Sequence, residues 1–288
     1  MKFILSLLLL SSFVFAIDVD ISTSIISNAK TVLFEFKKEK NITYEKALIG
    51  TKEYKIFDHP TDETKMYMLV PISYYEKPND KKIKIIYNEN DKTQEKSFFI
   101  RVKEGDYEKE SIKVSNSKVH LNEKDKKRAA KEYQEAMEIY NSSTPKSYIN
   151  SKFIVPLKSK ITSDFGKARV YNDTLKGYHS GTDFRAKVGV PIKASNDGVV
   201  ALAKDRFYSG GSIIIDHGQG IYTCYYHMSR FDVQKGTRVK KGQIIGLSGD
   251  SGRVTGPHLH FSVRVSGIQV DPLQFITLMN QNIFKGIQ

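Results

Sequence analysis

The stretch from Gly256 to Val265 constrains the fold of this chain most strongly. Its side chains alternate between polar and apolar, with His258, His260, Ser262 and Arg264 on one parity and Leu259, Phe261, Val263 and Val265 on the other. Because successive side chains of a strand point to opposite faces, the alternation predicts a strand with one face in a core and the other facing a cleft. Two imidazoles then share a face, as a structural pair or as part of a metal or catalytic site.

The composition is that of a globular protein. A chain of 288 residues with 40% hydrophobic and 27% charged residues predicts about two domains and excludes disordered and fibrous classes. The formal charge of +13 is spread over lysines with no strong helical stripe, so we expect no nucleic-acid partner. A polyanionic wall or envelope surface is one alternative, and a soluble lysine-rich surface is the other.

Residues 1–16 have the pattern of a secretory signal peptide. A basic start at Lys2 and an apolar run lead to small residues around Ala16, which predicts cleavage before Ile17 and export across the inner membrane to the periplasm or cell wall. An uncleaved anchor is the alternative, but the run is short for a membrane span. We therefore expect no stable membrane insertion after cleavage.

Residues 17–119 predict a strand-rich module, a small β-sandwich. Five apolar segments are separated by turn clusters such as Lys77 to Asp80 and Asn88 to Asp91. The expected strands are residues 31–36, 54–57, 66–75, 82–87 and 97–102. The module has no cluster of catalytic residue types, so it is expected to bind, position or inhibit.

The pattern changes to helical periodicity between Asn122 and Tyr140, within a connecting region at residues 120–150. One face is apolar, and the helix is expected to pack through it against one of the two domains. That face carries Ala129, Ala130, Tyr133, Ala136, Met137 and Tyr140. His120, just before the helix, is expected at the surface.

Residues 151–288 predict a compact antiparallel β domain of about 130 residues, a usual single-domain size. Apolar alternations are punctuated by many glycines, and no helical period of useful length appears. The single Cys224 cannot form an intramolecular disulfide. Since Cys224 shares parity with Tyr222 and Tyr226, we expect it to be a small core residue facing away from any site.

Five of the seven histidines lie in this second domain. His179 and Asp183 are four residues apart, so both side chains face the same way on extended chain. Together with one imidazole from the final strand they supply three ligands for Zn²⁺ and leave a fourth position for water, as in a catalytic zinc site.

The order and spacing of the motifs from about Ile161 to Phe275 resemble the lysostaphin/LytM family of zinc peptidoglycan peptidases. The motifs are His179-x-x-x-Asp183, Asp216-His217-Gly218-x-Gly220, Tyr225-Tyr226-His227-Met228, Gly249-x-Ser251-Gly252 and Gly256-Pro257-His258-Leu259-His260-Phe261. The resemblance does not extend to the N-terminal half. It implies a mainly β protein with a lysostaphin/LytM-type C-terminal domain and one zinc ion per chain.

The resemblance implies a role for each site residue. His179, Asp183 and His260 would be metal ligands, and His227 and His258 would be catalytic, moving protons to and from the reacting groups. Which of the two is the base stays open. His217 falls outside the implied site and is expected to be structural. Arg169 and Arg264 either steer a substrate carboxylate or are exposed bystanders.

We therefore expect a zinc-dependent D,D-endopeptidase that acts on peptidoglycan cross-links. A D,D-carboxypeptidase that trims stem peptides is one alternative, and a non-catalytic activator of other wall hydrolases is another. The departures from the family pattern are Met228, Ser251 and Ser262, none of which is at a ligand position. The scissile bond, the oligomeric state and the role of the N-terminal module stay open.

Overall fold

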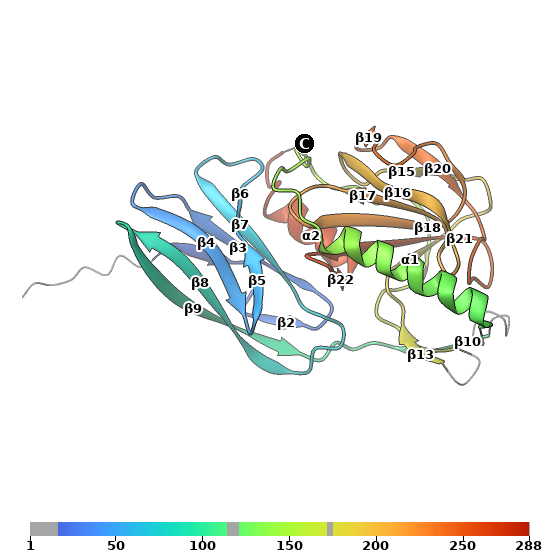
Figure 1. Ribbon diagram of the computed structural model, residues 1–288, viewed down its shortest axis with the longest axis horizontal. Coiled ribbons are helices and arrows are strands. Elements are labelled where there is room, and N and C mark those ends of the chain that lie inside the picture. The colour runs from blue at the N-terminus through green and yellow to red at the C-terminus, as the bar shows by residue number, and fades with distance from the viewer. Residues whose placement is uncertain (1–16, 114–120, 172–174, 288) are drawn as a thin grey trace, which may run out of the picture.

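The computed structural model describes residues 17–113, 121–171 and 175–287. The expected signal peptide and His120 lie outside these residues. The N-terminal module consists of two facing sheets, drawn in blue and teal in Figure 1. The first has the order β1(Val19–Ile21), β3(Thr31–Lys37), β7(Lys65–Pro71), β6(Phe57–Asp58), and the second β2(Ile25–Ser27), β9(Lys92–Lys103), β8(Asn79–Glu89), β4(Ile42–Ile49), β5(Lys52–Lys55).

Alternating apolar residues hold the two sheets together. Phe34 and Phe36 of β3 pack in one cluster with Ile83 and Ile85 of β8, and all four are buried. The expected sandwich is therefore confirmed. The expected strand at 54–57 is divided between β5 and β6, and the expected turn at 77–80 is shorter, because β8 begins at Asn79.

Strand β4 was not predicted from the sequence. Its pairing with β8 shifts register between Tyr44 and Lys46, so the buried residues Ile42, Tyr44 and Ala47 are unevenly spaced. A bulge of this kind breaks the alternation by which strands are found in sequences.

The C-terminal domain is built on a ten-stranded sheet whose pairing is antiparallel throughout. Its main path is β11(Ile161–Ser163), β14(Thr182–Arg185), β21(His258–Val265), β18(Ile221–Phe231), β17(Gly210–Asp216), β16(Gly198–Arg206), β19(Arg238–Val239), and β15(Pro191–Lys193), β20(Ile244–Ser248) and β22(Ile268–Val270) pair beside it. A separate three-stranded sheet has the order β10(Lys109–Ile112), β12(Ala168–Tyr171), β13(Leu175–Tyr178).

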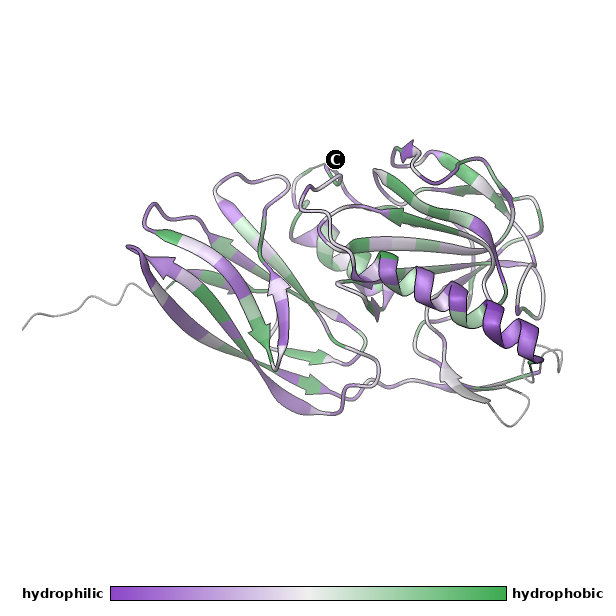
Figure 2. Ribbon diagram, in the orientation of Figure 1, coloured by the Kyte–Doolittle hydropathy of each residue, from purple (hydrophilic) through white to green (hydrophobic). Residues whose placement is uncertain are grey.

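Helix α1 (Glu123–Asn141) confirms the expected connecting helix, and the Asn122 side chain caps its start by accepting a hydrogen bond from the Asp125 amide at 2.8 Å. Only its last turns are buried, where Ala136 and Tyr140 pack on the C-terminal sheet. Tyr133, which was expected on the packed face, is 64% exposed. Figure 2 shows the visible face of α1 as largely hydrophilic.

Helix α2 (Pro272–Gln281) contradicts the prediction of a C-terminal domain without a helix. Asp271 caps it by accepting from the amides of Leu273 and Gln274, and Pro272 occupies its first turn. The helix lies between the two halves of the protein and contacts both β21 and β3. At ten residues, the helix is shorter than the window of about 11–18 residues over which helical periodicity is recognised in a sequence.

The two halves share part of one core. Leu33, Tyr67 and Leu69 of the N-terminal module belong to the same buried cluster as the C-terminal sheet. The Tyr67 hydroxyl donates to Gln219 Oε1 at 2.5 Å. In the described part of the chain, neither helix combines the length and apolar character that crossing a membrane requires.

Candidate metal centre and active site

The pairing of β14 with β21 brings two of the three expected metal ligands together. Asp183 stands directly opposite His260 in the antiparallel register. His179 precedes β14, and its Nε2 lies 2.9 Å from Asp183 Oδ1 and 3.1 Å from His260 Nδ1. His260 Nδ1 is also 2.9 Å from Asp183 Oδ1. Three ligand atoms from three buried residues therefore converge on one point.

The hydrogen bonds around the cluster leave the required nitrogen available. His179 Nδ1 donates to the Asp164 carbonyl at 2.7 Å, so the lone pair is on Nε2, which faces Asp183. A methyl group at Gly181 would lie 2.4 Å from His260 Nε2. Only glycine at this position therefore lets the His260 ring lie where it does.

Charge also suits a divalent cation. Burial alone would raise the pKa of the Asp183 carboxyl, but the His179 and His260 side chains beside it outweigh burial and hold that pKa well below its usual value. Burial lowers the pKa of His260 to about 4. An ionised carboxylate and neutral imidazoles are the forms that bind metals. Around a tetrahedral ion with bonds of about 2.05 Å, neighbouring ligand atoms lie about 3.3 Å apart, close to the separations here, so the donor set fits zinc.

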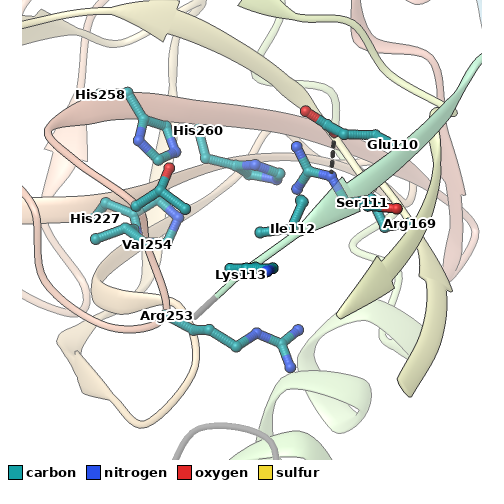
Figure 3. Close-up of a pocket in the computed structure, with 11 residues that line it drawn as sticks. Glu110, Ser111, Ile112, Lys113, Arg169, His227, Arg253, Val254, His258 and His260 are labelled. Carbon is teal, nitrogen blue, oxygen red and sulfur yellow. Dashed lines mark hydrogen bonds and ion pairs between the residues drawn. The ribbon is translucent and has the colours of Figure 1, made fainter. Parts of the chain in front are cut away.

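His258 and His227 lie beside this cluster, and Figure 3 shows them next to His260. His258 Nε2 is 3.5 Å from Asp183 Oδ1, and the His227 ring centroid is 4.8 Å from that of His258. His227 Nδ1 donates to the Ser251 carbonyl at 2.8 Å, and His258 Nδ1 donates to the Gly256 carbonyl at 2.8 Å. These bonds assign the lone pair of each ring to Nε2. Both imidazoles can therefore accept a proton at the site.

A bulge in β18 turns His227 toward the site. Tyr226 stacks on His260 with ring centroids 5.5 Å apart, so strict alternation would put the next residue on the opposite face. The register with β17 instead shifts between Ile213 and Gly211, and His227 has φ of +64°. An extra residue in the left-handed region re-aims a side chain in this way. Burial, and then the neighbouring His260 and His258, lower the pKa of His227 to about 3.

The other residues singled out from the sequence fall in different places. His217 is fully buried outside the cluster, with Nδ1 bonded to the Asp197 carbonyl at 2.6 Å and Nε2 2.7 Å from Thr223 Oγ1. Arg264 lies under α1, with its guanidinium 4.3 Å from the centre of the Tyr140 ring. Arg169 does reach the site, where Nη2 is 3.4 Å from Asp183 Oδ2.

Cys224 is buried, as expected, but the face assigned to it was wrong. It pairs with Ser262 on the face of the sheet that carries His260, and it packs under α1 with Tyr140. Its neighbour Tyr226 contacts both Tyr140 and His260, at opposite ends of this surface. The polar face of β21 is therefore part cleft and part a second small core.

Sequence reasoning missed the residues that line the other side of the site. Glu110 to Lys113, in and just after β10, face His227 and His258 across a cavity of about 220 Å³. No local pattern could have found them, because β10 is brought there by pairing with β12, some 60 residues further along.

Comparisons with known proteins agree with this geometry. Residues 177–272 match the family model described as Peptidase family M23. The chain is 41% identical over 124 residues to the peptidoglycan DD-endopeptidase ShyA of Vibrio cholerae, covering 43% of this chain and 29% of ShyA. It is 40% identical over 95 residues to the DD-carboxypeptidase/endopeptidase Mpg of Neisseria meningitidis, covering 33% of this chain and 22% of Mpg. The matches thus span less than a third of either relative.

A solved structure from Pseudomonas aeruginosa, described as a candidate M23 peptidase, resembles most of the chain. It has a TM-score of 0.65 and 26% sequence identity, and the likeness covers 85% of this chain and 93% of that one. The likeness therefore extends beyond the matched domain. Together with the family match, it confirms the lysostaphin/LytM-type fold expected from the motifs.

Proposed function

Because residues 177–272 form a peptidase family M23 domain, we propose that this protein is a zinc-dependent metallopeptidase that hydrolyses peptide bonds in peptidoglycan. Its main activity in this proposal is that of a D,D-endopeptidase on cross-links. The observation that carries the proposal is the convergence of His179, Asp183 and His260 beside two further imidazoles whose Nε2 atoms are available. ShyA, a DD-endopeptidase by name, supports the choice of bond.

Each residue has a defined task in this reaction. His179 Nε2, Asp183 Oδ1 and His260 Nδ1 would hold one zinc ion, which polarises the scissile carbonyl and lowers the pKa of a bound water toward ~7. We assign His227 and His258 to proton transfer: a neutral imidazole would accept the proton of the attacking water, and the imidazolium so formed would donate it to the leaving amine. Arg169 forms an ion pair with Oδ2 of Asp183, the carboxylate oxygen that is not assigned to the metal.

A D,D-carboxypeptidase is the second candidate. Residues of strand β10 line one side of the site. The remaining cavity is about 220 Å³, below the 300–1,000 Å³ that is common for ligand pockets. A wall of this kind favours a substrate that ends within the site, and the name of Mpg includes both activities. A non-catalytic activator is disfavoured, because all five expected site residues are present and adjacent.

We further propose export through residues 1–16 and action in the periplasm or at the cell wall, with peptidoglycan as the partner. The test is to digest purified sacculi with the zinc-loaded chain that begins at Ile17 and to separate the muropeptides. Conversion of dimers to monomers supports the endopeptidase, and shortening of pentapeptides to tetrapeptides supports the carboxypeptidase. An unchanged profile refutes both, and Asp183→Asn is the inactive control.

A further inference from the structure

Strand β10 lies at the active site although the sequence connects it to the N-terminal module. It pairs in parallel with β12, and the register places Glu110 beside Arg169. In Figure 1 a long connection from the N-terminal module leads to β10, at the far end of the catalytic domain. An extended segment at the edge of a sheet is also how many proteins bind a peptide.

Glu110 and Arg169 form a charged pair at the edge of the metal cluster. Arg169 Nε donates to Glu110 Oε2 at 3.0 Å, drawn as a dashed line in Figure 3. The same guanidinium donates through Nη2 to Ser163 Oγ at 3.1 Å and lies 3.4 Å from Asp183 Oδ2. One planar cation thus joins a carboxylate of β10 to a metal-ligating carboxylate, and guanidinium is the group best suited to bind carboxylates.

Strand β10 also fills space that a substrate needs. Glu110, Ser111 and Ile112 form one side of the cavity whose other side is made by His227 and His258. Any peptide that places its bond at these histidines and extends along β12 meets β10 first. The strand therefore stands where the continuation of an extended substrate would lie.

Contacts to both halves of the protein hold β10 in this position. Before the strand, the Tyr107 hydroxyl donates to the Asn28 carbonyl at 2.7 Å, and the Gly105 amide donates to Asn28 Oδ1 at 3.0 Å. On the catalytic side, the Ala168 amide donates to the Glu108 carbonyl at 2.8 Å. The placement of Glu110 is therefore set by the N-terminal module as well as by the pairing with β12.

We infer that Arg169 is the centre of a carboxylate-binding subsite for the peptide substrate, and that Glu110 occupies this subsite within the chain. The inference rests on the proposed peptidoglycan peptidase function. A substrate carboxylate replaces Glu110 on the guanidinium, and β10 leaves the edge of β12 as the substrate strand enters. The carboxylate is either the C-terminal one of a stem peptide or a side-chain one within the stem, and the chemistry of recognition is the same.

The test compares Glu110→Gln with the matched control Glu108→Gln in the zinc-loaded chain. Glutamine keeps the size of Glu110 but removes its charge, whereas Glu108 pairs with Lys167 away from the cavity. Calorimetry measures the Kd of a soluble stem tetrapeptide, which lacks the terminal D,D bond. We expect Glu110→Gln to lower the Kd about tenfold, because the peptide carboxylate no longer competes with Glu110 for one charge-assisted hydrogen bond to Arg169. Glu108→Gln should leave the Kd unchanged.

Amidated peptides identify which carboxylate is bound. One peptide is amidated at its C-terminus and another at its side-chain carboxylates. The tighter binding of the peptide by Glu110→Gln should disappear only for the peptide whose amidated group is the one that binds Arg169. Hydrogen exchange supplies a second readout, because backbone amides of residues 109–112 should exchange faster when the free-carboxylate peptide is bound.

Two results overturn the inference. One is an unchanged Kd in Glu110→Gln, and the other is a gain that persists when every carboxylate of the peptide is amidated. If the wild-type chain digests sacculi while either result is found, the subsite is wrong and the proposed function stands. If sacculi are not digested by the wild-type chain, the proposed function itself fails.

Discussion

Replacing His227 with asparagine separates zinc binding from proton transfer. The position has φ of +64°, a region that asparagine tolerates better than alanine, so His227→Asn avoids the backbone strain that His227→Ala would add. The asparagine amide can also keep a hydrogen bond to the Ser251 carbonyl, which the native ring makes at 2.8 Å. What is lost is the imidazole Nε2 beside His258.

The size of the expected loss follows from that role. A positioned general acid or base contributes about 100- to 10,000-fold to the rate, which corresponds to about 2.7–5.5 kcal/mol of barrier. Zinc content should stay at about one per chain, because His227 is outside the three-residue cluster. The double variant His227→Asn/His258→Asn should lose less than the product of the single losses, since both groups act on one reaction centre.

The assay measures zinc by elemental analysis and muropeptide release from sacculi on the same preparations. Ser229→Ala is the control, because Ser229 lies two residues along the same strand and bonds the Ser248 carbonyl at 2.7 Å, outside the site. It should retain both zinc and turnover. Loss of zinc in His227→Asn, or turnover equal to wild type, refutes the division into three ligands and two catalytic histidines.

Three further predictions concern the metal, the core and pH. His260→Ala should lose its zinc, and unchanged zinc on elemental analysis would contradict the ligand assignment. Cys224→Ser should keep zinc and activity, because its sulfur packs with Tyr140 under α1; zinc loss in this variant would show that the cluster under α1 extends to the metal. Burial lowers the pKa of His217 to about 4 from 6.5, so the unfolded chain binds this proton more readily. Stability should therefore fall as pH drops from 6.5 to 4, by about 3 kcal/mol from this group, and a urea titration of His217→Gln with the same pH dependence as wild type would contradict this.

The N-terminal module was expected from the sequence to have a role in binding, positioning or inhibition. The proposed subsite would make the module inhibitory, because Glu110 of β10 bonds Arg169 where we infer that a substrate carboxylate binds. A chain cut to begin at Ser151 would test this poorly, because the cut also removes α1 and exposes the surface that Tyr140 covers. Single substitutions in the full chain are the cleaner measurement.

Much of the site could be predicted from local pattern. The parity of His258 and His260 put these two side chains on one face, and the interval between His179 and Asp183 put that pair on one face, because strand geometry repeats every two residues. The choice of His260 as the third ligand came from the resemblance to the lysostaphin/LytM family. The helix at 122–140 followed from its period, and the structure adds that Asn122 caps its start. These features depend only on neighbours in the sequence.

Tertiary structure decided the rest. The left-handed φ of His227 and the bulge in β18 reverse the face that alternation assigns. Asp183 meets His260, and Glu110 meets Arg169, only through the pairing of strands distant in the chain. Periodicity tells which way a side chain points from its own strand, but the choice of neighbouring strand and the place where register breaks depend on packing across the whole core.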